Sequence, residues 1–231
     1  MLEPDSTVRV PLTEGTPGGF GSEALQILTA EHWSLLAARS LVYTEAMSRA
    51  SMFIAALSGA VVALALVAQA TDFGSGFVAF ALVLLPVVYF LGIVTIARLA
   101  QVNHENRLWV QGMNRIRNAY LQIAPELEPY FVASRYDDEA GVLVTSLGAH
   151  RPLPRLQPFI AVPGVIAVMD SVVAGAAAGI AGLGLDLGVF GALLVGAVFF
   201  VASIAFFALW ARKQIGTVST GLDPMFPSRA V

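Results

Sequence analysis

The sequence predicts an all-α integral membrane protein with four transmembrane helices, the first two of which extend into the cytoplasm as an antiparallel helical hairpin. Hydrophobic residues make up 57% of the chain and charged residues only 13%, against about 25% charged in an ordinary soluble domain. Four long segments are almost free of charge, and each is long enough to cross a bilayer as a helix. The basic residues also lie on one side of these segments, as in multi-pass membrane proteins.

The order of apolar and polar stretches divides the chain into five regions. Residues 1–21 are polar and rich in proline and glycine, which predicts a disordered N-terminal arm. The next regions are a transmembrane hairpin at 22–131 with spans at about 51–70 and 77–97, a cytoplasmic linker at 132–157, a second transmembrane hairpin at 158–211 with spans at about 159–183 and 187–211, and a polar cytoplasmic tail at 212–231.

The distribution of basic residues predicts the orientation. The two turns that join the spans, 71–76 and 184–186, contain no lysine or arginine, and all 13 basic residues lie in the other three polar regions. Because positive residues concentrate on the cytoplasmic side, we expect a multi-pass protein of the plasma (inner) membrane with its N- and C-termini in the cytoplasm.

The second helix carries a heptad pattern beyond its span. The stretch from Phe77 to Ile123 has no helix breaker after the apolar part, so one helix of roughly 70 Å would cross the membrane and continue into the cytoplasm. Mostly apolar residues at alternating spacings of three and four form a coiled-coil seam in this part of the helix: Leu99, Val102, Asn106, Trp109, Met113, Ile116, Tyr120 and Ile123. The one asparagine interrupts the apolar seam, and asparagine at a single such position commonly fixes register or oligomeric state.

The expected partner of this seam is the helix that precedes the first span. A helix is predicted there by a second pattern of alternating threes and fours, formed by Trp33, Leu36, Ser40, Tyr43, Met47 and Ala50. A short outer turn makes the two helices antiparallel and pairs residues whose numbers sum to about 147. We therefore expect three neighbouring sets: Met47 with Ala100, Leu36 with Gln111, and Glu31 with Arg115 and Arg117. The alternative is that the seam pairs with the same seam of another subunit.

The last two spans contain small residues at intervals of four. Gly175 and Gly179 lie in the third span, and Gly188 and Gly196 in the fourth. Such residues let helix backbones approach closely in lipid. Two arrangements fit the pattern, namely tight packing of the two spans within one chain, or a contact in a homo-oligomer.

Asp170 is the one ionisable residue well inside a predicted span. A carboxylate near the bilayer centre is costly and marks a functional site by default. With Tyr89 and Ser171 it forms the candidate polar or ion path, and Pro86 predicts a kink in the second span. Three interpretations fit: a neutral acid hydrogen-bonded between helices, a cation or proton site that could be repeated in an oligomer as an acidic ring, and a lipid-facing carboxyl that titrates.

Other chemistry finds little support in the residues. The chain has no cysteine, and its three histidines fall on separate segments, so we expect no metal site and no cofactor. The acidic run Asp137, Asp138 and Glu139 is typical of a solvated turn, with a divalent-cation contact as the alternative. No nucleotide-binding or hydrolase motif is present, which argues against an enzyme, and the net charge of −3 gives no sign of a nucleic-acid partner.

The layout also resembles known families. The run NRIRNAYLQIAPELEPYF at 114–131, after a span, is similar to a run in uncharacterised bacterial four-span membrane proteins. Two spans with long cytoplasmic extensions resemble SLATT-type two-span proteins over residues 22–131, and this family is thought to supply pore-forming effectors. The resemblance implies an oligomeric, membrane-permeabilising activity and assigns no residue roles.

Two functions follow as hypotheses. The first is a homo-oligomeric ion-conducting or membrane-permeabilising protein with Asp170 in the path. The alternative is a membrane-anchored scaffold or adaptor that recruits a cytosolic protein partner through its coiled-coil hairpin. In both cases the spans contact membrane lipids.

Overall fold

The computed structural model describes residues 21–147, 161–217 and 222–228, and every regular element in these ranges is helical. The predicted disordered arm, apart from Gly21, lies outside the described residues. The elements in chain order are α1 (Ser22–Thr71), α2 (Ser75–Ile123), the 3-10 helix η1 (Pro125–Tyr130), α3 (Glu139–Leu147), α5 (Val162–Gly184) and α6 (Gly188–Thr217).

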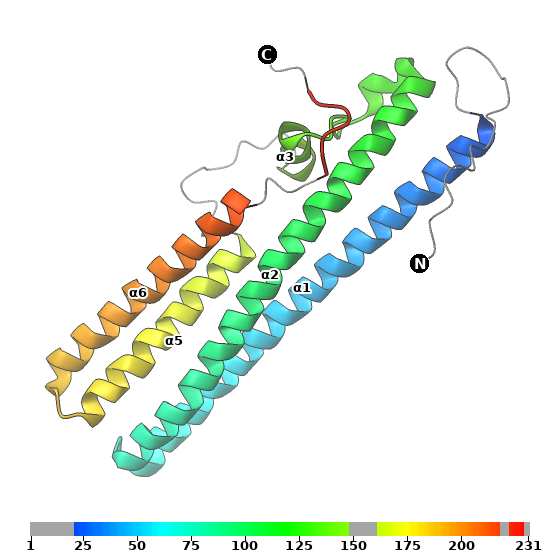
Figure 1. The fold of residues 1–231 in the computed structure, drawn as a ribbon. Helices are drawn as coiled ribbons and strands as arrows, with labels where there is room; N and C mark the ends of the chain where they lie inside the picture. Colours follow the sequence, from blue (N-terminus) through cyan, green and yellow to red (C-terminus); the bar gives the residue numbers. More distant parts are fainter. Residues whose placement is uncertain (1–20, 148–160, 218–221, 229–231) are drawn as a thin grey trace, which may run out of the picture.

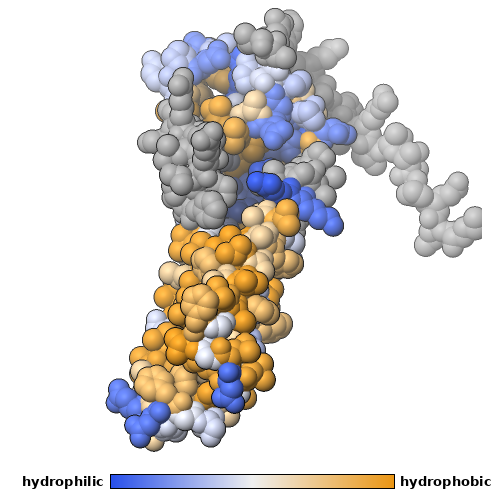
Figure 2. Space-filling view, turned by 90° about the vertical axis from the view of Figure 1, so that its left-hand side faces the viewer, coloured by the Kyte–Doolittle hydropathy of each residue, from blue (hydrophilic) through white to orange (hydrophobic). Residues whose placement is uncertain are grey.

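The four long helices lie side by side in one row (Figure 1). α2 packs between α1 and α5, and α5 packs between α2 and α6. All four are long and apolar enough to cross a membrane, which is the make-up of a multi-pass membrane protein. Figure 2 shows the apolar surface over one half of the molecule and hydrophilic residues at the other. We call the latter the polar half; its described residues are 22–50, 98–147 and 222–228.

The predicted helix extensions and the hairpin of the first two helices are confirmed. α1 has 50 residues and α2 has 49, so each continues well beyond the roughly 20 residues that a span needs. The helices reverse direction through Asp72 and Phe73, both with left-handed φ angles of 47° and 55°. α2 stays helical through Pro86, and the kink expected there remains a prediction.

The antiparallel register agrees with the prediction. Leu35 packs against Gly112, Arg39 donates a 2.8 Å hydrogen bond from Nε to Oδ1 of Asn106, and Arg98 contacts Glu45, so the paired numbers sum to 147, 145 and 143. Every seam residue of α2 is buried or half-buried. Asn106 therefore obtains its partner from Arg39 across the hairpin, within the same chain.

The face that α1 turns to α2 differs from the predicted one by a single residue step. The half-buried or buried positions include Leu28, His32, Leu35, Arg39, Val42 and Ala46, again at alternating spacings of four and three. Of the predicted pattern, Met47 is half-buried and Ala50 is buried. Trp33 and Tyr43 are instead 67% and 62% exposed. The predicted proximity of Leu36 to Gln111 stays a prediction: the neighbouring Leu35 packs against Gly112, and Gln111 donates to the carbonyl of Asp137.

Two further expectations for the polar half are corrected. Arg115 pairs with Asp137 rather than with Glu31, and Arg117 donates to Oδ1 of Asn114. The linker also contains the nine-residue helix α3, which packs against α2. Its first turn is capped by Asp138, whose Oδ1 accepts a 2.9 Å hydrogen bond from the backbone N–H of Gly141.

Candidate functional site

Asp170 lies on α5 and is completely buried against α2, with none of its surface exposed. Neither carboxyl oxygen has a hydrogen-bond partner among the described residues. Gly92 of α2 makes room for this side chain, because a Cβ atom at position 92 would overlap the carboxyl oxygens. A buried polar group without a partner costs free energy, so it needs an explanation in function or in an unseen ligand.

A chain of hydroxyl groups crosses three helices beside this carboxyl. The Oγ of Ser171, the residue after Asp170, donates to the carbonyl of Ala167 at 2.7 Å and is hydrogen-bonded to Oγ of Ser203 on α6 at 3.0 Å. Ser203 in turn lies 3.3 Å from the hydroxyl oxygen of Tyr89 on α2. The structure thus brings Tyr89 and Ser171 together through Ser203, in the layer that holds Asp170.

The other hydroxyls that could have satisfied Asp170 are engaged elsewhere. Ser58 donates to the carbonyl of Ile54, and Thr95 donates to that of Leu91, both within their own helices. A neutral acid hydrogen-bonded between helices is therefore not what the described residues form. Because Asp170 is buried within one chain, its carboxyl does not face a neighbouring copy as a ring of acids would require.

The glycines of α5 and α6 pack these two helices against each other within the chain. A Cβ at Gly175 would lie 2.9 Å from the carbonyl oxygen of Gly196, and one at Gly196 would lie the same distance from that of Gly175. Gly179 also contacts α6, at Ala192. Gly188 does not take part: it opens α6 with a φ of +68° and has nothing within 4 Å of a Cβ position.

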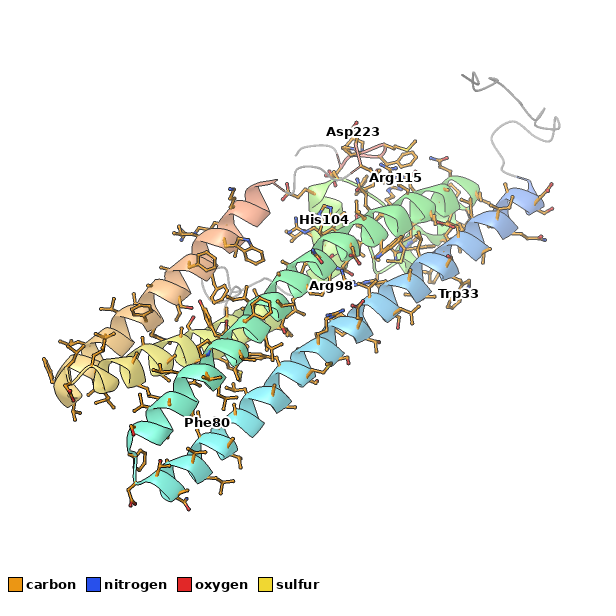
Figure 3. The ribbon with its side chains drawn as sticks, turned by 60° about the horizontal axis from the view of Figure 1, so that its bottom comes forward. Trp33, Phe80, Arg98, His104, Arg115 and Asp223 are labelled. Carbon is orange, nitrogen blue, oxygen red and sulfur yellow. The ribbon has the colours of Figure 1, made fainter. Side chains whose placement is uncertain are left out.

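In the polar half, Asp137 anchors the segment 222–228 to α2. Its Oδ2 accepts a 2.7 Å bond from Nε of Arg115 and a 2.9 Å bond from the N–H of Met225, while Oδ1 accepts from the N–H of Phe226 at 2.7 Å. Figure 3 shows Arg115 beside Asp223, whose carbonyl accepts a 2.6 Å bond from Nη2 of this arginine. The tail expected to be merely polar is thus partly docked, and we call 222–228 the strap.

Asp138 completes this contact. Its Oδ2 accepts hydrogen bonds from both the backbone N–H and the hydroxyl of Ser228. Burial raises the pKa of Asp137 and of Asp138, but the hydrogen bonds from Met225, Arg115 and Ser228 outweigh it and leave both pKa values below the ordinary range. The prediction of a solvated turn at 137–138 is therefore wrong, since Asp137 is 1% exposed.

Two buried amide side chains of α2 also donate hydrogen bonds to the strap and to residues 136–137. Nε2 of Gln111 donates to the carbonyls of Asp137 and Leu222 at 2.9 and 2.6 Å, and Nδ2 of Asn114 donates to that of Tyr136 at 2.7 Å. Both amides lie outside the heptad seam of α2, so the sequence pattern predicted no hydrogen-bond partner for them. The available signals were the capping position of Asp138 and the apolar pair at 225–226 in a polar tail.

No three His, Asp or Glu side chains come together as metal ligands within the described part of the chain. His32 stacks on Tyr120 with ring centroids 5.8 Å apart, and burial together with Arg117 lowers the pKa of this imidazole. Comparison of this chain with protein-family models, with curated proteins and with solved structures found no match.

Proposed function

We propose that this chain is a multi-pass protein of the plasma (inner) membrane, with both termini cytoplasmic, that moves protons through a homo-oligomer and uses Asp170 as the proton-binding group. The observation that carries the proposal is the buried carboxyl without a hydrogen-bond partner, seated on Gly92. Intramembrane acids of this kind mark proton and ion pathways.

The surroundings of Asp170 favour a proton over a metal cation. Hard cations such as Ca²⁺ need about six or more oxygen ligands, whereas no second oxygen lies within hydrogen-bond distance of this carboxyl among the described residues. A single carboxyl and a chain of hydroxyls are sufficient to accept and pass on a proton. Tyr89, Ser203 and Ser171 supply such a chain across α2, α5 and α6.

Transfer requires a movement of α2 relative to α5, because the carboxyl is sealed in this arrangement. Pro86 lacks a backbone N–H and leaves one carbonyl of the preceding turn without its helical partner, so α2 can bend there. A bend at Pro86 would shift Gly92, six residues later, and uncover Asp170. The single row of helices also favours an oligomer, since a row encloses no channel by itself. The resemblance to SLATT-type pore-forming effectors agrees with this role.

Proton flux into proteoliposomes tests the proposal. Purified protein is reconstituted with a pH-sensitive dye inside the vesicles, and flux is driven by a potassium diffusion potential. We expect the Asp170→Asn variant to lose about tenfold or more of the wild-type flux, because an amide cannot exchange a proton at this site. Asp186→Asn, in the turn of the same hairpin, is the matched control and keeps the wild-type rate.

A second pair of variants separates the position of the carboxyl from its presence. Gly92→Ala leaves Asp170 in the chain but displaces its oxygens, so flux should fall, while Gly59→Ala, where a Cβ meets nothing within 4 Å, leaves flux unchanged. Wild-type protein without flux at any pH or voltage, or flux indifferent to Asp170→Asn, would contradict the proposal.

The alternative function, a membrane scaffold, is supported by the size of the polar half. More than half of α1 and of α2 extends beyond the length of a span. A pore needs no helical surface of this length outside the membrane, whereas a scaffold would use it to bind a partner. In that case, disrupting Trp109 and Met113 would abolish capture of the partner, whereas Asp170→Asn would change nothing.

A further inference from the structure

A second face of α1 in the polar half has the form of a helix–helix contact, and most of it stays exposed among the described residues. We infer that this face binds the same face of a second copy of this chain, with the two α1 helices parallel. We call it the outer seam; it consists of Thr29, Trp33, Leu36, Ser40, Tyr43 and Met47. The inference does not depend on proton movement.

The spacing and exposure of the outer seam carry the first step. Its members follow one another at alternating spacings of four and three, the repeat of a coiled-coil seam. Trp33, Leu36 and Tyr43 are 67%, 40% and 62% exposed. Figure 3 shows Trp33 on the outer side of α1, away from α2. Large apolar side chains gathered on one exposed face of a polar segment indicate a binding surface.

The absence of charge on this face is the second step. None of the five charged residues of α1 between 22 and 50 belongs to the outer seam. The residues that flank the seam at positions 30, 37 and 44 are also uncharged: Ala30, Ala37 and Thr44. The hydroxyls of Thr29 and Thr44 donate back to the carbonyls of Leu25 and Ser40 in their own helix. These two hydroxyls are therefore already bonded within the helix, so burying them costs little.

Anchoring in a membrane favours a second copy of this chain as the partner that binds the outer seam. Two copies inserted in the same direction hold equal residues at equal heights, so a parallel pair of outer seams is in register without further adjustment. The outer seam also adjoins the α1–α2 contact, because each of its members follows a residue of that contact by one position. Pairing would thus extend the hairpin into four helices in the order α2, α1, α1, α2.

At the N-terminal end of α1, a groove could bind the largest side chain of the outer seam, Trp33 of the second copy. Trp33 and Leu36 border an apolar groove of about 470 Å³ that is also lined by Leu25, Tyr120, Leu127 and Phe131. In a parallel pair, Trp33 of each copy lies at the height of the other copy's groove. Aromatic side chains seated in such pockets commonly dominate the energy of an interface.

Disulfide crosslinking tests the pairing directly, because the chain has no cysteine of its own. Single variants Leu36→Cys, Ser40→Cys and Tyr43→Cys are oxidised in native membranes. We expect disulfides between two chains at these positions. Equal residues of a parallel seam face each other, and their Cα atoms come within the roughly 4.4–6.8 Å that a disulfide requires. Ile27→Cys and Leu41→Cys are matched controls: they are 63% and 72% exposed but lie on another side of α1, and they should not crosslink.

A charge variant gives the second measurement. Tyr43→Glu places a charge in the outer seam at a side chain that is exposed within the chain, so folding is preserved and the mass in detergent should fall to that of one chain. Leu41→Glu, at a side chain 72% exposed, should leave the oligomer intact. Crosslinks of equal yield at seam and control positions would overturn the inference. So would seam cysteines that form no disulfide, including the case in which another protein shields them in cells.

Discussion

The two halves of this molecule are held together by different physics. Between α5 and α6 the closest approach is between glycine backbones, where a Cβ placed at Gly175 would lie only 2.9 Å from the carbonyl oxygen of Gly196. In the polar half, the strap is held by charged hydrogen bonds to Asp137 and Asp138. Lipid offers no hydrophobic gain for helix pairing, so close approach has to supply the attraction, whereas in water a buried and fully bonded carboxylate can organise three segments.

The largest effect is expected at the anchor of the strap. Asp137→Ala leaves Arg115 and the N–H groups of Met225 and Phe226 without their acceptor, at a cost of about 3 kcal/mol. The strap should detach and become sensitive to limited proteolysis. Glu139→Ala, an exposed acid two residues along, is the control. Equal protease resistance of the two variants would mean that Asp137 does not hold the strap.

In the membrane half, a bulky residue should have a slightly smaller effect. Gly175→Leu forces α5 and α6 apart, and overpacking of this kind costs about 1–3 kcal/mol. Stability is followed by unfolding in mixed micelles, with Gly59→Leu as the control at an open position. If the strap stays protected in Gly175→Leu, the two halves are energetically separable; simultaneous release would show that they are not.

Acid should distinguish the halves without any mutation. The pKa values of Asp137 and Asp138 are lowered when the strap is docked, so docking is fully favoured above their ordinary value of 3.8 and weakens as the pH falls through the lowered values. We expect strap protection to persist from neutral pH to about 3.8 and to be lost below it. The α5–α6 contact should survive the same titration, as measured by crosslinking between these helices.

The smallest effect is expected at the border of the halves. Glu45 accepts hydrogen bonds from Arg98 and Arg49, which lower its pKa to about 2. These side chains are open to solvent, so salt screens the network. Glu45→Gln should lower the melting temperature less than either variant above, and the difference should vanish at high salt. A loss as large as that of Asp137→Ala would contradict this ranking.

The sequence predicted the elements of this fold well because its signals are local. Hydropathy located four helices, and a turn of a few residues required the antiparallel register of α1 and α2. The phase of α1 was misread because apolar size favours Trp33, Leu36 and Tyr43. The actual interface uses His32, Arg39 and Ala46, and the first two of these contact Tyr120 and Asn106 on α2.

The candidate site was predicted in part for the same reason. Asp170 stands out in an apolar span, and its burial follows from its cost in lipid. Gly92, on which it sits, looks like any glycine of a membrane helix until the two spans are brought together. The strap could not be inferred, because its bonds join residues almost ninety positions apart, such as Met225 and Asp137.

The strap has a mechanical consequence. It follows α6 after only residues 218–221, and five Cα–Cα steps of about 3.8 Å reach at most roughly 19 Å, so Thr217 is tethered to α2 near Arg115. A tilt of α6 imposed by bilayer thickness or tension would therefore pull on the polar half, and a force on the polar half would pull on α6. The strap therefore couples the position of α6 in the apolar half to the position of α2 in the polar half.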